Sequence, residues 1–565
     1  MPARLFLLLS LFVVAVGAAL PAFAAESTAP QGAAAAGQAP EPQKPRVRVT
    51  ISKQTTVITE PLRPDGYPDY LEAVNRMASQ GVTPQNNAMV LLVKAFGPRE
   101  ITEGVRAEYF KRLGIDPLPE QGEYFVTKFD YVTGIIYDAL DAPISMEEHD
   151  RRRDEASGQF DLAGNRPWSK ADCPLVAGWL EANENPLRLI VEASGRPRFY
   201  SPLVSPAQKK GTFAGASWGP EFSFVIEAVR ALIARAHLHI SEGKTPQAME
   251  DLLAGHRLAR LFGQGPTCIH GLTSAALDAL VFRVDATVAH YGKLTLQQAQ
   301  PYSEQLRKLP PLPSAVERID RFERLLAADM ICAVARGDLD ILWLLSQGWE
   351  KIYWTPESLR PIAAWMFIDG DLMLRTSNEQ FDRLVAAGRR PSFAERIKAL
   401  RDMEKEVKKE YETRAKPLAI TAQALKTTSP RKAVSQTAVL SLMNLIEFGV
   451  RDSVETQQGD EIYGDLAQVA LALGAYRTDH GRYPAELAAL APKYIAELPK
   501  DRYSDGQIKY RQEKDGYVLY SVGPNLKDDG GLSVSVWGRE KAPGDGQRGS
   551  ELPDDVGFRV PLPPQ

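Results

Sequence analysis

The string GASWG, from Gly215 to Gly219, has the residue types of a nucleophile elbow with Ser217 as the nucleophile. Such an elbow needs a buried strand before the serine and a helix after it, because the sharp turn exposes the hydroxyl. A helical pattern follows, but the preceding SPAQKKGTFA is polar and interrupted by Pro and Gly. Only helical patterns follow downstream, without the alternating strands that would deliver an acid and a histidine. The context therefore argues against catalysis at Ser217.

Two neighbouring histidines and two aspartate pairs could also act as ligands or as acid-base groups. His237 and His239 are two apart on an expected helix, so they point to different sides and cannot share an ion as an i, i+4 pair does. The aspartate pairs have no further acidic or His neighbours in sequence, which favours turn and capping roles. These pairs are Asp338 with Asp340 in RGDLD and Asp369 with Asp371 in IDGDLM.

A further candidate is the dipeptide Asp479-His480 in YRTDHGRYP, which follows an apolar helical pattern. Adjacency in sequence does not aim two side chains at one atom, and no third group is evident. Asp479 and Gly481 have the residue types of a helix end, since glycine adopts the positive φ that reverses a chain. Tyr483 and Pro484 then fix the exit. We predict a helix terminus here, not a catalytic dyad.

Tryptophan and cysteine usage indicates no particular site. Four of the eight tryptophans, at positions 343, 349, 354 and 365, fit a core or groove better than a carbohydrate platform. The cysteines are too few and too far apart for a disulfide framework or a zinc knuckle, and we expect them to be buried small apolar residues. They are Cys173, Cys268 and Cys332.

The overall charge argues against nucleic acid as a partner. Lys and Arg total 67 against 71 Asp and Glu, which gives a formal charge of -4. Nothing in this balance draws the protein toward nucleic acid or an anionic membrane. With 44% hydrophobic residues, the chain can bury substantial cores, and its length beyond Arg46 suits roughly three domains.

The N-terminus has the pattern of a secretory signal peptide. The apolar block LFLLLSLFVVAVGAAL is followed at residues 22–24 by AFA, the small-x-small pattern of a cleavage site. Cleavage leaves residues 25–45, rich in Ala, Pro, Gln and Gly, as a disordered linker. An uncleaved anchor is the alternative, since the block falls only slightly short of the roughly 17 to 25 residues of a span, but the cleavage site favours removal. We expect export to the periplasm or cell surface, with no membrane span after signal cleavage.

Hydrophobic periodicity predicts few strands before the C-terminal region. RVRVTIS, from Arg46, alternates as a strand does. YLEAVNRMASQGV and NNAMVLLVKAFGP predict two helices, closed by Gly81 and Gly97. The region from about Met146 to Gly219 is expected to be loop-rich.

Helical signals are clearest from Pro220 onward. PEFSFVIEAVRALIARAHLHISEG and KTPQAMEDLLAGHRLARLFGQG predict a helical hairpin, with Thr245 as the second N-cap. LTSAALDALVFRVDATVAHYG and PPLPSAVERIDRFERLLAADMICAVARG predict two more helices, the latter with capping-box spacing at Ser314 and Glu317. No regular period links the pairs, which favours an irregular bundle over a solenoid. AERIKALRDMEKEVKKEYETRAKP predicts a solvated helix or a linker.

A long helix is predicted from about Ser429 to Arg477, with an interruption near Gly459 left open. Its apolar stripe, at steps of four and three that require a partner surface, is Ile462, Leu466, Val469, Leu473 and Tyr476. QIKYRQEKDG and YVLYSVGPNLKDDGG then alternate as strands and predict a β-hairpin, with Asp515-Gly516 as its turn.

The ordered set YRTDHGRYP, YIAELPKD and VLYSVGPNLKDDGG is similar to the C-terminal domain of the type II secretion major pseudopilin. The similarity covers roughly residues 460 to 535 and implies a pilin-like α+β head, in which a long helix packs on a small antiparallel sheet. Segments such as TTVITEPLRPDGYPDYLEAVN resemble uncharacterised exported bacterial proteins, and this resemblance implies no activity.

In the pseudopilin family, the loop after the last strand can hold calcium. The resemblance implies Asn525, Asp528 and Asp529 as candidate calcium ligands, with Asp554 or Asp555 as further oxygen donors. Asn525 stands where the family has an acidic residue, which lowers the expected affinity, and another residue replaces the usual Pro after LPKD. The family also has a leader and a long apolar segment that packs into a filament. No such segment precedes the head here, so assembly into a pseudopilus is not expected.

The sequence thus predicts a mainly α multidomain protein, an irregular helical body with a C-terminal pilin-like α+β head. The expected divisions are a signal peptide (1–24), a disordered linker (25–45), a mixed, partly helical region (46–218), a helical domain (219–428), the long helix and head (429–540), and an extended tail (541–565). The favoured function is non-catalytic, a structural or binding role among protein partners in an envelope or secretion-related assembly. The alternatives are an exported hydrolase with a site in the helical body and a helical scaffold that binds peptides in a groove.

Overall fold

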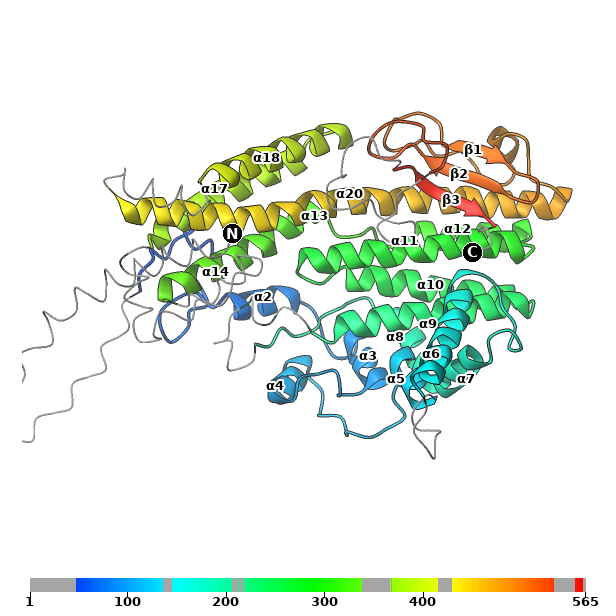
Figure 1. Ribbon diagram of the computed structural model, residues 1–565, viewed down its shortest axis with the longest axis horizontal. Helices are drawn as coiled ribbons and strands as arrows, with labels where there is room; N and C mark the ends of the chain where they lie inside the picture. Colours follow the sequence, from blue (N-terminus) through cyan, green and yellow to red (C-terminus); the bar gives the residue numbers. More distant parts are fainter. Residues whose placement is uncertain are drawn as a thin grey trace, which may run out of the picture.

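The computed structural model is mainly helical, with one small antiparallel sheet (Figure 1). It describes residues 47–135, 145–205, 219–337, 368–414, 429–532 and 554–561, and single positions at 213, 216 and 366. The expected signal peptide and linker lie outside the described residues, as do Ser217, Asp338, Asp340 and the tryptophans at 343, 349, 354 and 365. None of the described helices combines the length and apolar character needed to cross a bilayer.

Short helices make up the first part of the described chain. They are α2 (Tyr70–Ala78), α3 (Ala88–Phe96), α4 (Glu103–Leu113) and α5 (Lys128–Thr133). The first two confirm the predicted helices, and the side chains of Asp69 and Asn87 accept backbone N–H groups in their first turns. Gly97 ends α3 at a φ of 78°, a conformation that suits glycine.

The strand predicted at Val47, Val49 and Ile51 is wrong, because these residues pair with no other strand. The backbone N–H groups of this segment donate hydrogen bonds to side chains instead. The N–H of Arg48 donates to the Tyr67 hydroxyl at 3.1 Å, and the N–H of Thr50 donates to the Asp371 carboxylate at 2.6 Å. Alternation of apolar residues here reflects one buried side chain, Val49, in an extended segment.

The region expected to be loop-rich is helical, so that prediction is wrong. It forms α6 (Met146–Asn165), α7 (Pro174–Ala182) and α8 (Glu184–Ser194). At the start of α6, the Ser145 hydroxyl accepts the N–H of Glu148, whose carboxylate pairs with Arg151 and Arg152 one turn later. The charged run is therefore the solvated side of a helix that buries only two alanines, and it lacks a strong apolar stripe.

The helical body is built on the predicted hairpin. Its helices are α9 (Glu221–Ser241), α10 (Thr245–Phe262), α11 (Cys268–Tyr291), α12 (Leu296–Arg307), α13 (Ala315–Arg318), the π-helical η4 (Ile319–Glu323) and α14 (Arg324–Arg336). Helix α10 packs against both α9 and α11. Lys244, rather than Thr245, is the residue before α10, and the hydroxyl of Ser314 accepts the N–H of Glu317 as predicted.

The second half of the chain contributes α17 (Gly370–Gly388), α18 (Phe393–Arg414) and the long α20 (Pro430–His480). Helix α18 confirms the helical alternative for the charged segment AERIKALRDMEKEVKKEYETR. Helix α20 continues through Gly459 without interruption. Figure 1 shows α20 running the length of the molecule, with α17 and α18 along its N-terminal half and the sheet along its C-terminal half.

Four of the five residues in the predicted stripe of α20 are buried. Ile462, Leu466, Val469 and Leu473 are all buried, and α11 and α20 pack along their lengths. The two helices approach closely at Gly474, where a Cβ atom would lie 2.5 Å from the carbonyl oxygen of α11 residue 289. Glycine is needed at this crossing because any side chain would strike the opposite backbone. One hydrophobic core runs through the body and the sheet.

The sheet lies on the C-terminal half of α20. Its strands, in the order β1-β2-β3 and antiparallel throughout, are β1 (Lys509–Gln512), β2 (Tyr517–Ser521) and β3 (Val556–Val560). Strands β1 and β2 confirm the predicted hairpin, and Leu519 pairs with Tyr510 on one side and Phe558 on the other. The sequence did not indicate β3, which lies within the range assigned above to an extended tail.

A buried aspartate, Asp501, fastens the segment before the sheet to the end of β2. One carboxylate oxygen accepts the N–H of Tyr503 and the hydroxyl of Ser521, each at 2.8 Å. The other oxygen accepts the N–H of Val522 at 3.0 Å. The carboxylate therefore replaces water for three buried donors, which fixes this loop against β2.

Candidate functional site

The helix end at YRTDHGRYP has the structure that the sequence predicts. Gly481 ends α20 in the left-handed conformation, at a φ of 72°. The Asp479 carboxylate accepts hydrogen bonds from Lys493 at 2.9 Å and from the Tyr494 hydroxyl at 2.8 Å, whereas His480 contacts Tyr494 at 3.1 Å. The two side chains thus share Tyr494 as a neighbour and do not form a dyad.

The loop after β2 brings two of the three predicted calcium ligands together. The side-chain amide of Asn525 donates to the Asp529 carboxylate at 2.9 Å, and the backbone N–H of Asp554 donates to the same oxygen at 3.3 Å. The Asp554 carboxylate in turn accepts the backbone N–H of Asn525 at 3.1 Å. The Asp529 and Asp554 carboxylates therefore both lie beside Asn525, which presents its nitrogens to them, whereas its side-chain oxygen accepts the N–H of Lys527.

The third predicted ligand, Asp528, is directed away from this place. Its carboxylate accepts the Tyr520 hydroxyl at 2.8 Å and the N–H of Gly530 at 3.1 Å, and it lies 3.4 Å from the Lys509 ammonium. These partners satisfy Asp528 at the surface of the sheet. The resemblance predicted its identity as a ligand, but the loop conformation gives it another role.

Negative charge is concentrated where the loop meets β3. Burial, and then the charges of Asp529 and Asp555, raises the pKa of Asp554 to about 6. Burial also raises the pKa of Asp555, which accepts the N–H of Gly531 at 2.7 Å. An oxygen-seeking cation would relieve this repulsion. Among the described residues, no three His, Cys, Asp or Glu side chains are grouped to hold a metal, so a cation would also need amide or backbone oxygens.

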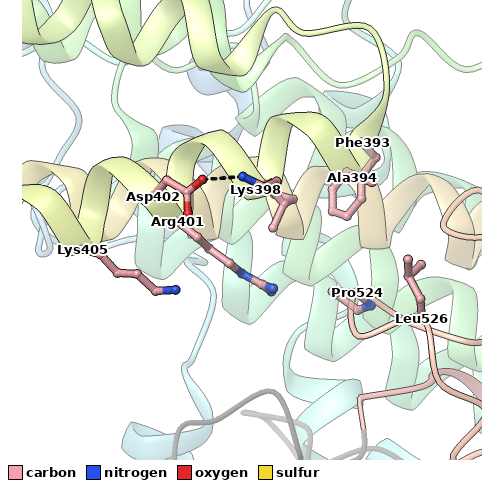
Figure 2. Close-up of a pocket in the computed structure, with 9 residues that line it drawn as sticks. Phe393, Ala394, Lys398, Arg401, Asp402, Lys405, Pro524 and Leu526 are labelled. Carbon is pink, nitrogen blue, oxygen red and sulfur yellow. Dashed lines mark hydrogen bonds and ion pairs between the residues drawn. The ribbon is translucent and has the colours of Figure 1, made fainter.

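A pocket of about 390 Å³ lies beside the same loop, between α18 and the residues that follow β2 (Figure 2). Its apolar lining comes from Phe393 and Ile397 of α18 and from Pro524 and Leu526 of the loop. The ring of Phe393 packs edge-on against Tyr503, with centroids 4.9 Å apart. The pocket is therefore built jointly by a helix of the body and the loop of the sheet.

Basic side chains line the α18 side of the pocket. Lys398, Arg401 and Lys405 are spaced by three and four residues, which places them on one face of the helix. Lys398 pairs with Asp402 at 2.8 Å, and Arg401 lies 3.2 Å from the Glu455 carboxylate. No ion pair joins Lys405 to any described residue. Figure 2 shows Arg401 extending from α18 toward the side where Pro524 lies.

Leu526, at the opposite wall, is both exposed and strained. Its side chain is 52% exposed, and its φ is 59°, in the left-handed region. Such a conformation costs a non-glycine residue roughly 1–2 kcal/mol. A large apolar side chain that is held in a strained conformation and presented to solvent beside a pocket is a candidate contact residue.

A second polar cluster lies deep in the helical body. His256 of α10 is fully buried between Asp278 and Asp285 of α11, and its Nε2 lies 2.9 Å from Asp285. The Tyr302 hydroxyl donates to Asp285 at 2.6 Å. Burial disfavours the charged imidazole, but the two carboxylates outweigh it and raise the pKa of His256 to about 9. An imidazolium that donates to both aspartates joins α10 to α11 by charge-assisted hydrogen bonds.

Asp460 of α20 reaches the same cluster. Burial and the neighbouring Asp278 raise the pKa of Asp460 well above its usual range. A protonated Asp460 can donate to Asp278, so the long helix is tied to α11 by a buried hydrogen bond as well as by apolar packing. This cluster has no described pocket beside it, and its groups stabilise the packing of the helices.

A serine, a glutamate and a histidine also meet inside the body, but not in the order of a catalytic triad. Ser201 donates to the Glu221 carboxylate at 2.8 Å, and His270 lies 3.6 Å from the other oxygen of Glu221. All three side chains are buried. A triad places the histidine next to the serine, where it accepts the proton. Here the glutamate separates them, so His270 is not positioned to activate Ser201.

The remaining predicted groups have structural roles. His237 contacts the carbonyl of Ala163 at 2.9 Å, whereas His239 lies 3.2 Å from Asp251, so the two histidines face different partners as predicted. Asp369 caps α17, which confirms a capping role. Asp371 anchors the N-terminal segment through the contact with Thr50 described above. The cysteines are free and buried, as expected, at Cys173, Cys268 and Cys332.

No protein-family model, curated protein or solved structure matches this chain. The function must therefore be argued from the geometry. Neither the pocket nor the His256 cluster was among the predicted sites, although a pattern in the sequence corresponds to each. Lys398, Arg401 and Lys405 share one helical face, and Asp278 and Asp285 stand seven residues apart within an otherwise apolar helix.

Proposed function

We propose that the protein is exported and acts without catalysis, as a binding or structural component of an envelope or secretion-related assembly, through a pilin-like head. The observation that carries the proposal is the C-terminal arrangement itself. A long helix ends at Gly481, the chain returns through Tyr483, and an antiparallel sheet covers the helix. The rings of Tyr463 in α20 and Phe558 in β3 lie 5.5 Å apart, which joins the helix to the sheet.

The head acts as part of this molecule and not as a filament subunit. A filament-forming helix must offer its apolar face to other subunits. The apolar side chains in the C-terminal half of α20 are already buried within this molecule, where the helix packs on α11, α12 and the sheet, and its N-terminal half packs on α17 and α18. We place the partner surface on the exposed residues of β1, on the loops of the sheet and on the exposed face of α18.

The geometry gives less support to an exported hydrolase. The described pocket contains Lys, Arg and Asp side chains but no His, Ser or Cys. The buried Ser201, Glu221 and His270 are in the wrong order for a nucleophile and its base. A groove that binds peptides, the other alternative, agrees with the mixed apolar and basic lining of the pocket.

The proposed head also includes a calcium site, formed by the oxygens of Asn525, Asp529 and Asp554, with Asp555 nearby. Bound Ca²⁺ would neutralise the repelling carboxylates and fix the loop to β3. We expect millimolar calcium to raise the melting temperature of the protein and magnesium to do so less. Asp554→Asn should abolish the shift, whereas Asp528→Asn should retain it. Equal shifts in both variants would contradict this ligand set.

The proposed function can be tested by fractionation and cross-linking in the native host. The full-length protein should be found in the envelope fraction, cross-linked to envelope or secretion components through residues introduced on α18 and on the sheet. Cross-linkers placed on α4, at the other side of the body, provide the control. A protein that stays in the cytoplasm, or that cross-links equally from all positions, would contradict the proposal.

A further inference from the structure

We infer that the pocket between α18 and the loop after β2 binds an acidic peptide segment of a protein partner, one that presents an apolar side chain next to a carboxylate. The inference rests on the proposed binding function and specifies its site and ligand chemistry. Two separate properties of the pocket support it, namely its lining and its shape.

The side chains that line the pocket suit a ligand with both an apolar group and an anionic group. Phe393, Ile397 and Leu526 form an apolar surface on which a leucine-sized side chain can pack. Three basic side chains, Lys398, Arg401 and Lys405, line the pocket beside a single acidic one, Asp402, so the lining carries an excess of positive charge. A ligand that buries an apolar group at the first surface and places a carboxylate near Lys405 satisfies both.

The shape favours a peptide over a compact small molecule. The pocket is bounded by one helix and one loop, and the side chains at its rim are exposed, with Lys398 at 80% and Asp402 at 56%. A small ligand normally has 70–90% of its surface buried, roughly, which needs more walls. A peptide can place single side chains into an open pocket while its backbone remains outside.

The conformation of Leu526 is a further observation that supports the inference. Glycine and asparagine adopt a φ near 59° at the least cost, and a leucine occupies this position. The leucine is instead held strained and 52% exposed at the pocket wall. A partner that covers Leu526 buries its apolar side chain. The free energy of that contact offsets the backbone strain at Leu526, and the contact exists only in the complex.

The test uses the full-length mature protein and a short fluorescein-labelled peptide that alternates Leu with Glu, with a Leu-Lys peptide as its control. Fluorescence anisotropy should show binding of the acidic peptide alone, weaker as salt rises. Lys405→Glu should weaken this binding about tenfold or more, because it places like charges together. Lys94→Glu makes the same charge change at an exposed lysine of α3, away from the pocket, and should leave binding unchanged.

A second variant separates binding from folding. Leu526→Gly removes the apolar contact and relieves the backbone strain, so it should weaken binding about tenfold without lowering the melting temperature. Equal binding of the two peptides, or no effect of Lys405→Glu, would overturn the inference. So would binding to phosphatidylglycerol vesicles in place of the peptide, or self-association that Lys405→Glu abolishes.

The inference and the proposed function can fail separately. If wild type and Lys405→Glu cross-link to the same envelope partners equally well, the pocket is not the docking site, although the proposed function stands. If the acidic peptide binds as expected but no envelope component is ever recovered, the pocket is confirmed and the proposed cellular role is lost.

Discussion

Replacing Gly474 by alanine tests whether α20 is a shared support of the body and the sheet. The added Cβ would lie 2.5 Å from the backbone oxygen of Ala289 in α11 and 3.1 Å from its carbonyl carbon. Non-bonded contacts of this kind are comfortable near 3.5 Å, so the two helices must separate by about 1 Å. Backbone atoms cannot rotate out of the way as a flexible side chain can.

The same helix contains a matched control. A Cβ at Gly459 would meet no other atom within 4 Å. Alanine at an open helical position gains about 1 kcal/mol over glycine, and Gly474→Ala receives the same gain. The difference between the two variants therefore isolates the clash, which for overpacking of a tight contact is about 2 to 3 kcal/mol. We expect Gly459→Ala to be more stable than wild type and Gly474→Ala to be less stable.

Urea unfolding followed by far-ultraviolet circular dichroism measures the two free energies. Hydrogen exchange adds the spatial information, since Gly474→Ala should lower the protection of both α11 and β2, whereas Gly459→Ala should lower neither. The reasoning is refuted if Gly474→Ala is as stable as Gly459→Ala, or if the exchange of β2 is unchanged while that of α11 rises.

Two further predictions concern buried charges. The pKa of His256 is raised to about 9 in the folded protein, against about 6.5 when unfolded, so its contribution is present in full below pH 6.5 and is lost as the pH rises through 9. It amounts to about 3 kcal/mol, and urea midpoints at pH 6 and pH 9.5 should differ less in His256→Gln than in wild type. Asp501→Ala leaves three buried donors unpaired and should cost about 3 kcal/mol or more, measured by urea unfolding, whereas an unchanged midpoint would contradict the role of Asp501 in holding β2.

Much of the C-terminal region could be predicted because its signals are local. The stripe from Ile462 to Leu473 repeats at the helical period. Gly481 ends the helix because glycine readily adopts the left-handed conformation. The turn at Asp515-Gly516 likewise fixes the hairpin from adjacent residues. In each case a few neighbouring residues determine the geometry.

The features that escaped prediction depend on residues far apart in sequence. β3 is a short strand that residues 522–555 separate from β2 in sequence, so its pairing depends on a contact that no local pattern encodes. The pocket needs Phe393 and Leu526 together, and neither segment alone indicates a cavity. The strand predicted around Val49 was wrong for the same reason. The backbone N–H groups of this segment donate to side chains that are distant in sequence, not to a neighbouring strand. Helix α6 was missed for a different reason, since charged residues cover most of its surface.

The placement of β3 has a consequence for how the sheet forms. β1 and β2 are joined by a tight turn and can pair as soon as both exist, but β2 gains its second partner only when β3, which residues 522–555 separate from it in sequence, reaches its other edge. Until then, the outer edge of β2 is a row of unpaired N–H and C=O groups on a strand whose side chains are all buried in the folded protein. Such an edge is a template for pairing with other chains. The docking of residues 556–560 therefore protects the newly folded protein against aggregation, and shortened chains that lack β3 should aggregate during refolding.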